Sequence, residues 1–284
     1  MTPEKKKELQ LFAVRARKNV ITSVHAAGSG HPGGSLSSID YLTYLYNVEM
    51  RNLDPKNPKK ADRDRFVLSK GHICPGLYAV LAQCGFFPES DLLTLRKPGS
   101  HLQGHPNMNL TPGVDLSTGS LGQGVSAAAG MAKAAKFLGQ DIRAYALTGD
   151  GEIAEGQIWE ALEFAAHYKL DNLCVAMDIN GLQIDGATKD VMNMEPIDEK
   201  CKAFGCDVIK IDGHDFDQIE KAFEHFHANI GTGVPTVILM KTVKGKGVSF
   251  MENQAGWHGK APNDKEFEQA MSELDAAEKE IKEA

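Results

Sequence analysis

The chain has 284 residues, of which 42% are hydrophobic and 24% are charged, and its formal net charge is -7 at pH 7. This length can bury a large core, and the acidic balance without a basic face argues against a general nucleic-acid-binding protein. No apolar run is long enough to cross a bilayer and the first residues do not resemble a signal peptide, so we expect a cytoplasmic protein without membrane association.

Four helices, one short strand and one long loop are expected in the first 140 residues. Apolar residues recur at helical spacing over residues 4–27, and a helix rich in alanine and glycine is expected over 119–138. The small side chains of that second helix suit close packing against other helices or a partner subunit. Between these two helices we expect helices at 35–45 and 76–84, a short buried strand at 65–68 and a long loop at 96–118.

From residue 144 onward, apolar strands alternate with amphipathic helices. Strands are expected at 144–147, 173–178, 208–211 and 235–241, with helices between them at 153–168, 195–204 and 216–227. This alternation predicts an α/β fold, a parallel sheet covered by helices on both faces. A glycine-rich loop at 244–247 and a charged helix at 263–284 follow. Because no linker or repeat interrupts the pattern, we expect a single domain over 1–284.

The five cysteines lack the spacing of a zinc ribbon. Cys201 and Cys206 form the closest pair, and we expect them to be small buried thiols that flank the end of a helix. Free thiols of this kind are consistent with a reducing cytoplasm.

Two short polar loops follow neighbouring strands of the expected sheet. Gly149-Asp150-Gly151 comes directly after the strand at 144–147, and Asn180 comes at the end of the next strand. The glycines let the backbone approach a phosphate, and carboxylate and amide oxygens are suitable ligands for Mg²⁺. Either loop alone is a common turn, but the pair predicts a magnesium diphosphate clamp. The glycine pattern excludes a P-loop and fits a dinucleotide fingerprint poorly.

Four histidines lie in loops that contain glycine or proline, where functional residues concentrate: His31, His72, His105 and His258. Their number around a phosphate clamp suggests a polyhydroxylated, anionic substrate. Zinc is a weaker interpretation, because no two of them have the spacing of a ligand pair on one element. The other histidines are less informative: His167, His225 and His227 are expected on helices as surface or packing residues, His101 is a weaker loop candidate, and His25 and His214 stay ambiguous.

Taken together, five ordered motifs resemble the amino-terminal, diphosphate-binding domain of transketolases. The resemblance runs from about residue 10 to residue 262. It is carried by Ser29-Gly30-His31-Pro32-Gly33, Gly104-His105-Pro106, Thr118-Gly119-Ser120-Leu121-Gly122-Gln123-Gly124, Gly149-Asp150-Gly151 and Ile184-Asp185-Gly186. The Gly-Asp-Gly sequence followed about thirty residues later by Asn180 also resembles the thiamine diphosphate signature.

The resemblance implies thiamine diphosphate as cofactor and Mg²⁺ as metal, with Ca²⁺ or Mn²⁺ as substitutes. It implies that the metal is bound by the side-chain oxygens of Asp150 and Asn180 and by the backbone carbonyl of Leu182. Gly151 would contact the diphosphate through its backbone. Gly119 and Leu121 would line the thiamine pocket.

The resemblance also implies catalytic roles for the four loop histidines. His31 and His258 match the histidines that handle protons on the sugar oxygens, and His72 and His105 match those near the cofactor and the substrate hydroxyls. His72 and His258 are also expected to contact the cofactor. Glu155 matches a glutamate of a carboxylate network at the interface between subunits, and a first-turn acid favoured by the helix dipole is its alternative interpretation.

Two positions depart from the transketolase pattern and bear on sugar specificity. Asn107 stands where many members have an acid, and Ser120 stands where many have proline. A complete transketolase is more than twice this length and has pyrimidine-binding and carboxyl-terminal domains. We therefore expect a split enzyme in which this chain needs a second subunit carrying those domains, with two copies of each chain.

The implied reaction is transfer of a two-carbon ketol unit from a ketose phosphate to an aldose phosphate. Two alternatives stay open at this point. One is the thiamine-binding subunit of a 2-oxo acid dehydrogenase, and the other is a non-catalytic cofactor-binding protein. The loop histidines and the intact clamp favour the sugar enzyme over both.

Overall fold

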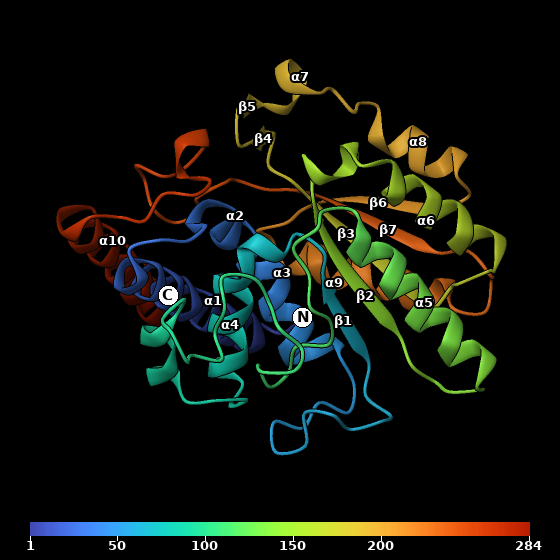
Figure 1. Cartoon of the computed structure of the whole chain (residues 1–284), viewed down its shortest axis with the longest axis horizontal. Coiled ribbons are helices and arrows are strands. Elements are labelled where there is room, and N and C mark those ends of the chain that lie inside the picture. Colours follow the sequence, from blue (N-terminus) through green and yellow to red (C-terminus); the bar gives the residue numbers. More distant parts are fainter.

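A five-stranded parallel sheet forms the centre of the computed structural model, which describes residues 1–284 (Figure 1). The strand order is β1-β2-β3-β7-β6, and every neighbouring pair is parallel. The strands are β1 (Arg65–Leu68), β2 (Ala144–Gly149), β3 (Leu173–Ile179), β6 (Asp207–Asp212) and β7 (Thr236–Lys241). The expected α/β fold with a parallel sheet is confirmed.

The sheet separates two apolar clusters, because successive side chains of a strand point to opposite faces. In β2, Tyr145 and Leu147 belong to a cluster of 48 buried residues, whereas Ala144 and Ala146 belong to a cluster of 21. Figure 1 shows two helices of the smaller cluster, α5 (Gln123–Phe137) and α6 (Gly156–His167), side by side on one face, and α8 (Ile197–Ala203) adds Ile197 and Cys201 to the same cluster.

The larger cluster lies under a thick helical layer on the other face of the sheet. This layer contains α1 (Pro3–Ala27), α2 (Pro32–Ser37), α3 (Ile39–Tyr44), α4 (Cys74–Gln83) and α9 (Phe216–Asn229). The last helix, α10 (Asp264–Glu283), packs along α1, so the two ends of the chain share one layer (Figure 1). A capping box between Asn263 and Glu266 begins α10.

Two expected helices have different boundaries from those that the apolar spacing predicts. The helix expected at 35–45 begins earlier, at Pro32, and is divided into α2, α3 and a π-helical turn over Leu45–Glu49. Proline is favourable in the first helical turn, which explains the earlier start. The helix expected at 119–138 begins only at Gln123, because Gly119 and Gly122 adopt positive φ angles of 149° and 83°.

The helix expected at 153–168 is interrupted at Glu155. A 3₁₀ turn covers Glu152–Ala154, and Glu155 adopts an extended conformation directly before α6. The backbone of the clamp loop therefore turns twice before the helix begins.

A projecting arm after β3 was not expected from the sequence. It contains β4 (Leu182–Gln183), which pairs antiparallel with β5 (Gly186–Ala187), and the short helix α7 (Thr188–Val191). Figure 1 shows this arm extending away from the sheet before the chain returns through α8 (Ile197–Ala203). Ile184 and Met192 on the arm are 66% and 56% exposed.

None of the helices combines the length and the apolar composition that crossing a membrane requires. All five cysteines are free, and four of them are buried. Cys201 lies on α8 and Cys206 just beyond its end, so the expectation of buried thiols at a helix end is confirmed.

Candidate functional site

A cavity of about 340 Å³ lies at the carboxyl ends of β2 and β3. Loops at this edge of a parallel sheet are the usual ligand-binding position of open α/β folds. Its lining comes from segments that are far apart in the sequence: Gly34, Lys70, His72, Leu121, Gly149–Glu152, Asn180, Leu182–Ile184, Lys244 and His258.

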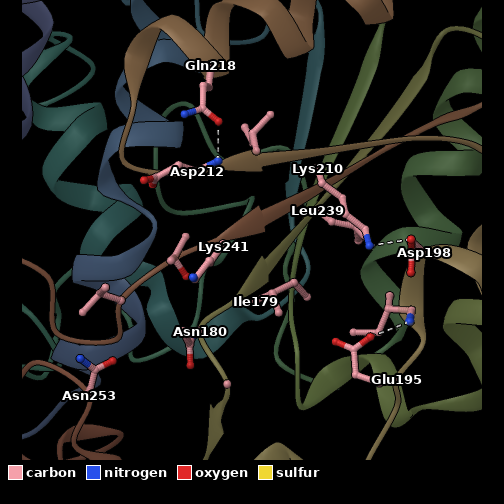
Figure 2. A pocket seen from close by; sticks show the side chains of 15 residues that line it. Ile179, Asn180, Glu195, Asp198, Lys210, Asp212, Gln218, Leu239, Lys241 and Asn253 are labelled. Carbon is pink, nitrogen blue, oxygen red and sulfur yellow. Dashed lines mark hydrogen bonds and ion pairs between the residues drawn. The ribbon is translucent and has the colours of Figure 1, made fainter.

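A larger neighbouring cavity of about 810 Å³ is a poorer candidate (Figure 2). Two pairs of its polar lining groups bond to each other. Lys210 Nζ lies 2.6 Å from Asp198 Oδ2, and the Asp212 amide donates to Gln218 Oε1 at 2.9 Å. The Lys210 side chain is 64% exposed, and the lining contains no histidine.

Asp150 is the acidic centre of the smaller cavity and is buried. Its Oδ2 accepts a hydrogen bond from the Gly181 amide at 2.6 Å, and its Oδ1 accepts one from the Gly151 amide at 2.9 Å. Burial and the nearby Asp178 carboxylate raise the pKa of Asp150 to about 6. Such a carboxyl group lies in an environment that a bound cation would stabilise.

The three expected metal ligands line this one cavity. Asn180 Oδ1 accepts from the Leu182 amide at 3.1 Å, and the Leu182 carbonyl accepts from Lys244 Nζ at 3.4 Å. A carboxylate, an amide oxygen and a carbonyl oxygen form a donor set suited to Mg²⁺, Ca²⁺ or Mn²⁺. No group of three or more His, Cys, Asp or Glu side chains is placed to hold a metal, so a zinc site is not supported. Together with the raised pKa of Asp150, this donor set fits a hard cation.

Two buried lysines in the site were missed by the sequence reasoning. Lys70 and Lys244 are each only 2% exposed, and both line the cavity. Lys70 forms an ion pair with Asp178, while Lys244 Nζ lies 3.3 Å from His258 Nδ1. Burial lowers the pKa of Lys244. Buried ammonium groups next to a cavity are suited to a phosphate-bearing ligand. The sequence feature that could have drawn attention to these lysines is their position shortly after apolar strands.

Asp178 was also missed, and it joins several elements beneath the cavity. It accepts hydrogen bonds from Ser37 Oγ at 2.6 Å and Ser38 Oγ at 3.2 Å, and it also accepts from Lys70 and Thr242. Burial would raise the pKa of Asp178, but the Lys70 charge and these hydrogen bonds outweigh burial and lower it to about 2. The ionised carboxylate therefore fixes the ends of β1, β3 and β7 relative to one another.

Glu152 is a third acid that the sequence reasoning did not select. It is 3% exposed and accepts hydrogen bonds from Ser69 Oγ at 2.5 Å, from the Gly122 amide at 2.8 Å and from the Gly149 amide at 3.1 Å. Burial raises its pKa. Glu155, by contrast, has an exposed side chain and does not line the cavity. Its expected role at an interface between subunits stays a prediction.

Three of the four loop histidines form one cluster. The ring centroids are 5.1 Å apart for His31 and His72, 5.0 Å for His72 and His258, and 5.5 Å for His31 and His258. Burial and neighbouring positive groups lower the pKa of His31 and of His258 to about 4, and that of His72 to about 2. The three rings are therefore neutral at pH 7, and Nδ1 of His31 is buried without a hydrogen-bond partner.

His105 lies outside this ring cluster, beside Gly119. A Cβ atom at Gly119 would lie 2.8 Å from His105 Cδ2, so a larger residue at this positive-φ position would collide with the ring. Burial and the Arg96 charge lower the pKa of His105. Of the other expected cofactor contacts, Leu121 and Gly151 line the cavity, and Leu121 is 38% exposed.

The histidines expected on helices are found there, outside the candidate site. His167 lies on α6, and His225 and His227 lie on α9. His225 pairs with Asp207, and His227 Nε2 lies 2.8 Å from Glu49. The ambiguous His214 lies in a buried network with Asp40.

Comparison with known proteins gives similarity over nearly the whole chain. Residues 10–281 match the family described as transketolase, thiamine diphosphate binding domain. The chain is 44% identical over 272 residues to a 6-deoxy-6-sulfo-D-fructose transketolase subunit of Clostridium sp. (strain MSTE9), covering 96% of this chain and 98% of that protein. It is 43% identical to an apulose-4-phosphate transketolase subunit of Actinobacillus succinogenes, covering 94% and 95%.

Longer proteins match through only part of their length. The transketolase of Rattus norvegicus is 42% identical over 274 residues, which cover 95% of this chain and 42% of that protein. The solved transketolase of Campylobacter jejuni superposes with a TM-score of 0.88 at 32% identity, covering 99% of this chain and 46% of that one. For the Leishmania mexicana enzyme the TM-score is 0.85 at 30% identity. The chain thus spans about half the length of the solved structures that it matches.

Proposed function

This chain belongs to the transketolase family of transferases, and on that premise we propose that it is the amino-terminal subunit of a transketolase assembled from two kinds of polypeptide. The proposed reaction moves a two-carbon ketol unit from a ketose phosphate to an aldose phosphate. Support comes from length: the chain covers 98% and 95% of two relatives that are themselves described as subunits. It covers only 42–46% of longer transketolases. The family match also argues against a 2-oxo acid dehydrogenase subunit.

The smaller cavity is proposed to bind thiamine diphosphate together with Mg²⁺, Ca²⁺ or Mn²⁺. Asp150, Asn180 and the Leu182 carbonyl would hold the metal, and the backbone of Gly151 would approach the diphosphate. The ammonium groups of Lys70 and Lys244 would offset the phosphate charge that the metal leaves uncompensated. When bound, the cofactor supplies the electron sink for breaking a carbon–carbon bond next to a carbonyl group.

The histidine cluster is proposed to handle protons on the sugar oxygens. His31 and His258 are the acid–base pair, and His72 and His105 contact the cofactor and the substrate hydroxyls. Because the pKa values of His31, His72 and His258 are lowered, these rings are neutral at pH 7, and each has a ring nitrogen lone pair that can accept a hydrogen bond from a substrate hydroxyl group. Placing several neutral imidazoles around one cavity also orients a substrate that carries many hydroxyl groups.

A second subunit is proposed to supply the part of a transketolase that this chain does not contain. That part corresponds to the pyrimidine-binding and carboxyl-terminal domains, and the complex would have two copies of each chain. The two relatives described as subunits carry different sugars in their names, so the reaction class is proposed here rather than one sugar.

One observation carries this proposal: a single cavity at the strand ends joins a desolvated carboxylate, two buried lysines and neutral histidines. Calorimetry with thiamine diphosphate and MgCl₂ tests the binding, with and without the proposed second polypeptide, sought as a protein that co-purifies with this chain. We expect metal-dependent binding, and ketol transfer only with the second polypeptide present. Ketol transfer at a normal rate by this chain alone would refute the assembly from two polypeptides, and oxidative decarboxylation would refute the reaction class.

A further inference from the structure

The loop that carries Lys244 into the cavity leaves the sheet directly after β7. The Thr242 amide still donates to the Ile179 carbonyl of β3 at 3.2 Å, but the Val243 amide lies beyond the sheet and needs another acceptor. The Val243 amide donates a hydrogen bond to the side chain of His214, with 2.9 Å between Val243 N and His214 Nε2. The residue immediately before Lys244 is thus anchored by an imidazole ring.

The contact of the other ring nitrogen, Nδ1, determines which tautomer His214 adopts. Nδ1 lies 2.7 Å from Asp40 Oδ2, and a carboxylate oxygen can only accept here. Nδ1 must carry the proton, so Nε2 has the free lone pair that the Val243 amide needs. Only one of the two neutral tautomers satisfies both contacts.

Asp40 is itself held by Arg17 from α1. Arg17 Nη1 lies 3.1 Å from Asp40 Oδ1 and Nη2 lies 2.6 Å from Oδ2, a bidentate pair with both side chains 7% exposed. Burial would raise the pKa of Asp40, but the Arg17 charge and the His214 hydrogen bond outweigh burial and lower it to about 2. Arg17 Nε also donates to the Lys246 carbonyl at 3.2 Å, so the network contacts the same loop on both sides of Lys244.

A fixed backbone matters at this point because the Lys244 side chain is almost fully buried. Removing its ammonium group from water costs free energy. This desolvation lowers the pKa of Lys244. An unanchored loop would let the lysine turn toward water. His214 lines neither of the two cavities, so it has no direct contact with a ligand there.

We propose that His214, oriented by Asp40 and Arg17, is a positioning residue that fixes the Val243–Lys246 segment and thereby holds Lys244 in place for a diphosphate. The inference rests on the proposed function, because thiamine diphosphate is the ligand that Lys244 would meet. His214 is not a catalytic residue, since its role is exerted entirely through the backbone of the loop.

The first test needs no substitution. Nitrogen-15 NMR of the imidazole side chains in the full chain should show His214 protonated at Nδ1 and unprotonated at Nε2, with a coupling to the Val243 amide. A His214 ring protonated at Nε2 would overturn the proposal. This measurement is independent of cofactor binding.

The second test compares His214→Ala with His214→Gln and with the control His225→Ala. His225 also pairs with an aspartate, Asp207, but on the surface and without contact to the loop. For His214→Ala we expect about 10-fold weaker binding of thiamine diphosphate with MgCl₂, because the Lys244 ammonium group would no longer be held at the position where it meets the diphosphate. We also expect faster trypsin cleavage after Lys244 and Lys246 under native conditions.

His214→Gln keeps an acceptor for the Val243 amide, so it should recover part of the affinity and of the protection from trypsin. His225→Ala should match the wild type in both measurements. Wild-type affinity and wild-type cleavage in His214→Ala would overturn the proposal. If the wild-type chain itself fails to bind the cofactor, the proposed function fails, while the NMR and trypsin measurements still decide whether His214 anchors the loop.

Discussion

The two neighbouring cavities share Asn180 but differ in how their charges are compensated. In the larger one, charged groups at the surface pair with one another, as Lys210 does with Asp198 (Figure 2). In the smaller one, Asp150, Lys70 and Lys244 are almost fully buried, and Asp150 receives only backbone hydrogen bonds.

This difference shows that cavity size alone is a poor guide to function. Burying a charge is costly unless a partner compensates it, so an incompletely compensated buried charge in a cavity indicates a position suited to binding a charged ligand. The smaller cavity has this property and the larger one does not.

Substitution of Asp150 should abolish cofactor retention. In Asp150→Ala the proposed metal site would lose its only carboxylate ligand. Losing a residue that merely orients a metal ligand costs up to about 100-fold in affinity, so we expect the affinity for thiamine diphosphate with MgCl₂ to fall by more than about 100-fold. Calorimetry measures the change. The matched control is Asp198→Ala in the larger cavity, which should retain wild-type affinity. Normal retention in Asp150→Ala would remove the basis for the clamp.

Substitution of His31 should separate chemistry from binding. His31→Ala is expected to lower turnover of the reconstituted two-subunit enzyme by about 10²- to 10⁴-fold, the usual contribution of a general acid or base. Metal and cofactor affinity should stay nearly unchanged, because His31 is not among the proposed metal ligands. His101→Ala is the control, since His101 pairs with Asp91 outside the cavity. Unchanged turnover in His31→Ala would refute the assignment.

The histidine cluster should make the stability of the chain sensitive to acid. The folded pKa values of His31, His72 and His258 lie at about 4, 2 and 4, below the ordinary value of 6.5. Below pH 6.5 the unfolded chain therefore binds protons that the folded chain rejects. The stabilising contribution is complete above pH 6.5 and is lost as the pH falls toward 4, with a slope approaching about 1.4 kcal/mol per pH unit for each ring.

Urea unfolding at pH 7.5, 6.5 and 5.5 measures this slope. His72→Gln should reduce the contribution of the cluster by about one third, because one of three rings no longer titrates. The larger cavity adds no histidine titration to the slope, since no histidine lines it. The raised pKa of Asp150, about 6, adds stability as the pH falls and would offset the histidines, so the comparison is made in the Asp150→Asn variant. Equal free energies of unfolding at pH 7.5 and 5.5 in that variant would contradict the assignment of buried neutral rings.

Breaking the Lys210–Asp198 pair should have the smallest effect. Exposed ion pairs contribute little to stability, so Lys210→Ala should leave the melting temperature and the cofactor affinity unchanged. Thermal unfolding and calorimetry test both. A loss of cofactor affinity in this variant would show that the larger cavity belongs to the binding site.

Much of the fold and part of the site could be predicted from the sequence. The strands were found because continuous apolar runs mark buried parallel strands, and Gly149-Asp150-Gly151 stood out because glycines flank an acid at a strand end. The break between α2 and α3 was missed because apolar spacing continues through it. The β4–β5 hairpin was missed because its two-residue strands are too short to show a period.

The charged residues of the site were harder to predict, because their burial exists only after distant elements assemble. The position of Lys70 and Lys244 shortly after apolar strands places them in loops at the sheet edge, but lysine is almost always exposed, so that position does not predict their burial. His214 was ambiguous for a similar reason: its partner Asp40 lies 174 residues away. Sequence patterns therefore indicate where the loops are, and assembly determines which charges face one another.

The division of the core by the sheet gives the thiols a use as reporters of unfolding. Cys74 and Cys174 lie in the larger cluster, and Cys201 and Cys206 lie in the smaller one. Burial raises the pKa of Cys74, Cys201 and Cys206 to about 12, so these thiols are unreactive in the folded protein. The rate at which each pair reacts with an alkylating reagent therefore measures how often its own side of the sheet opens. Mass spectrometry of the labelled peptides can then time the opening of the two halves separately in one sample.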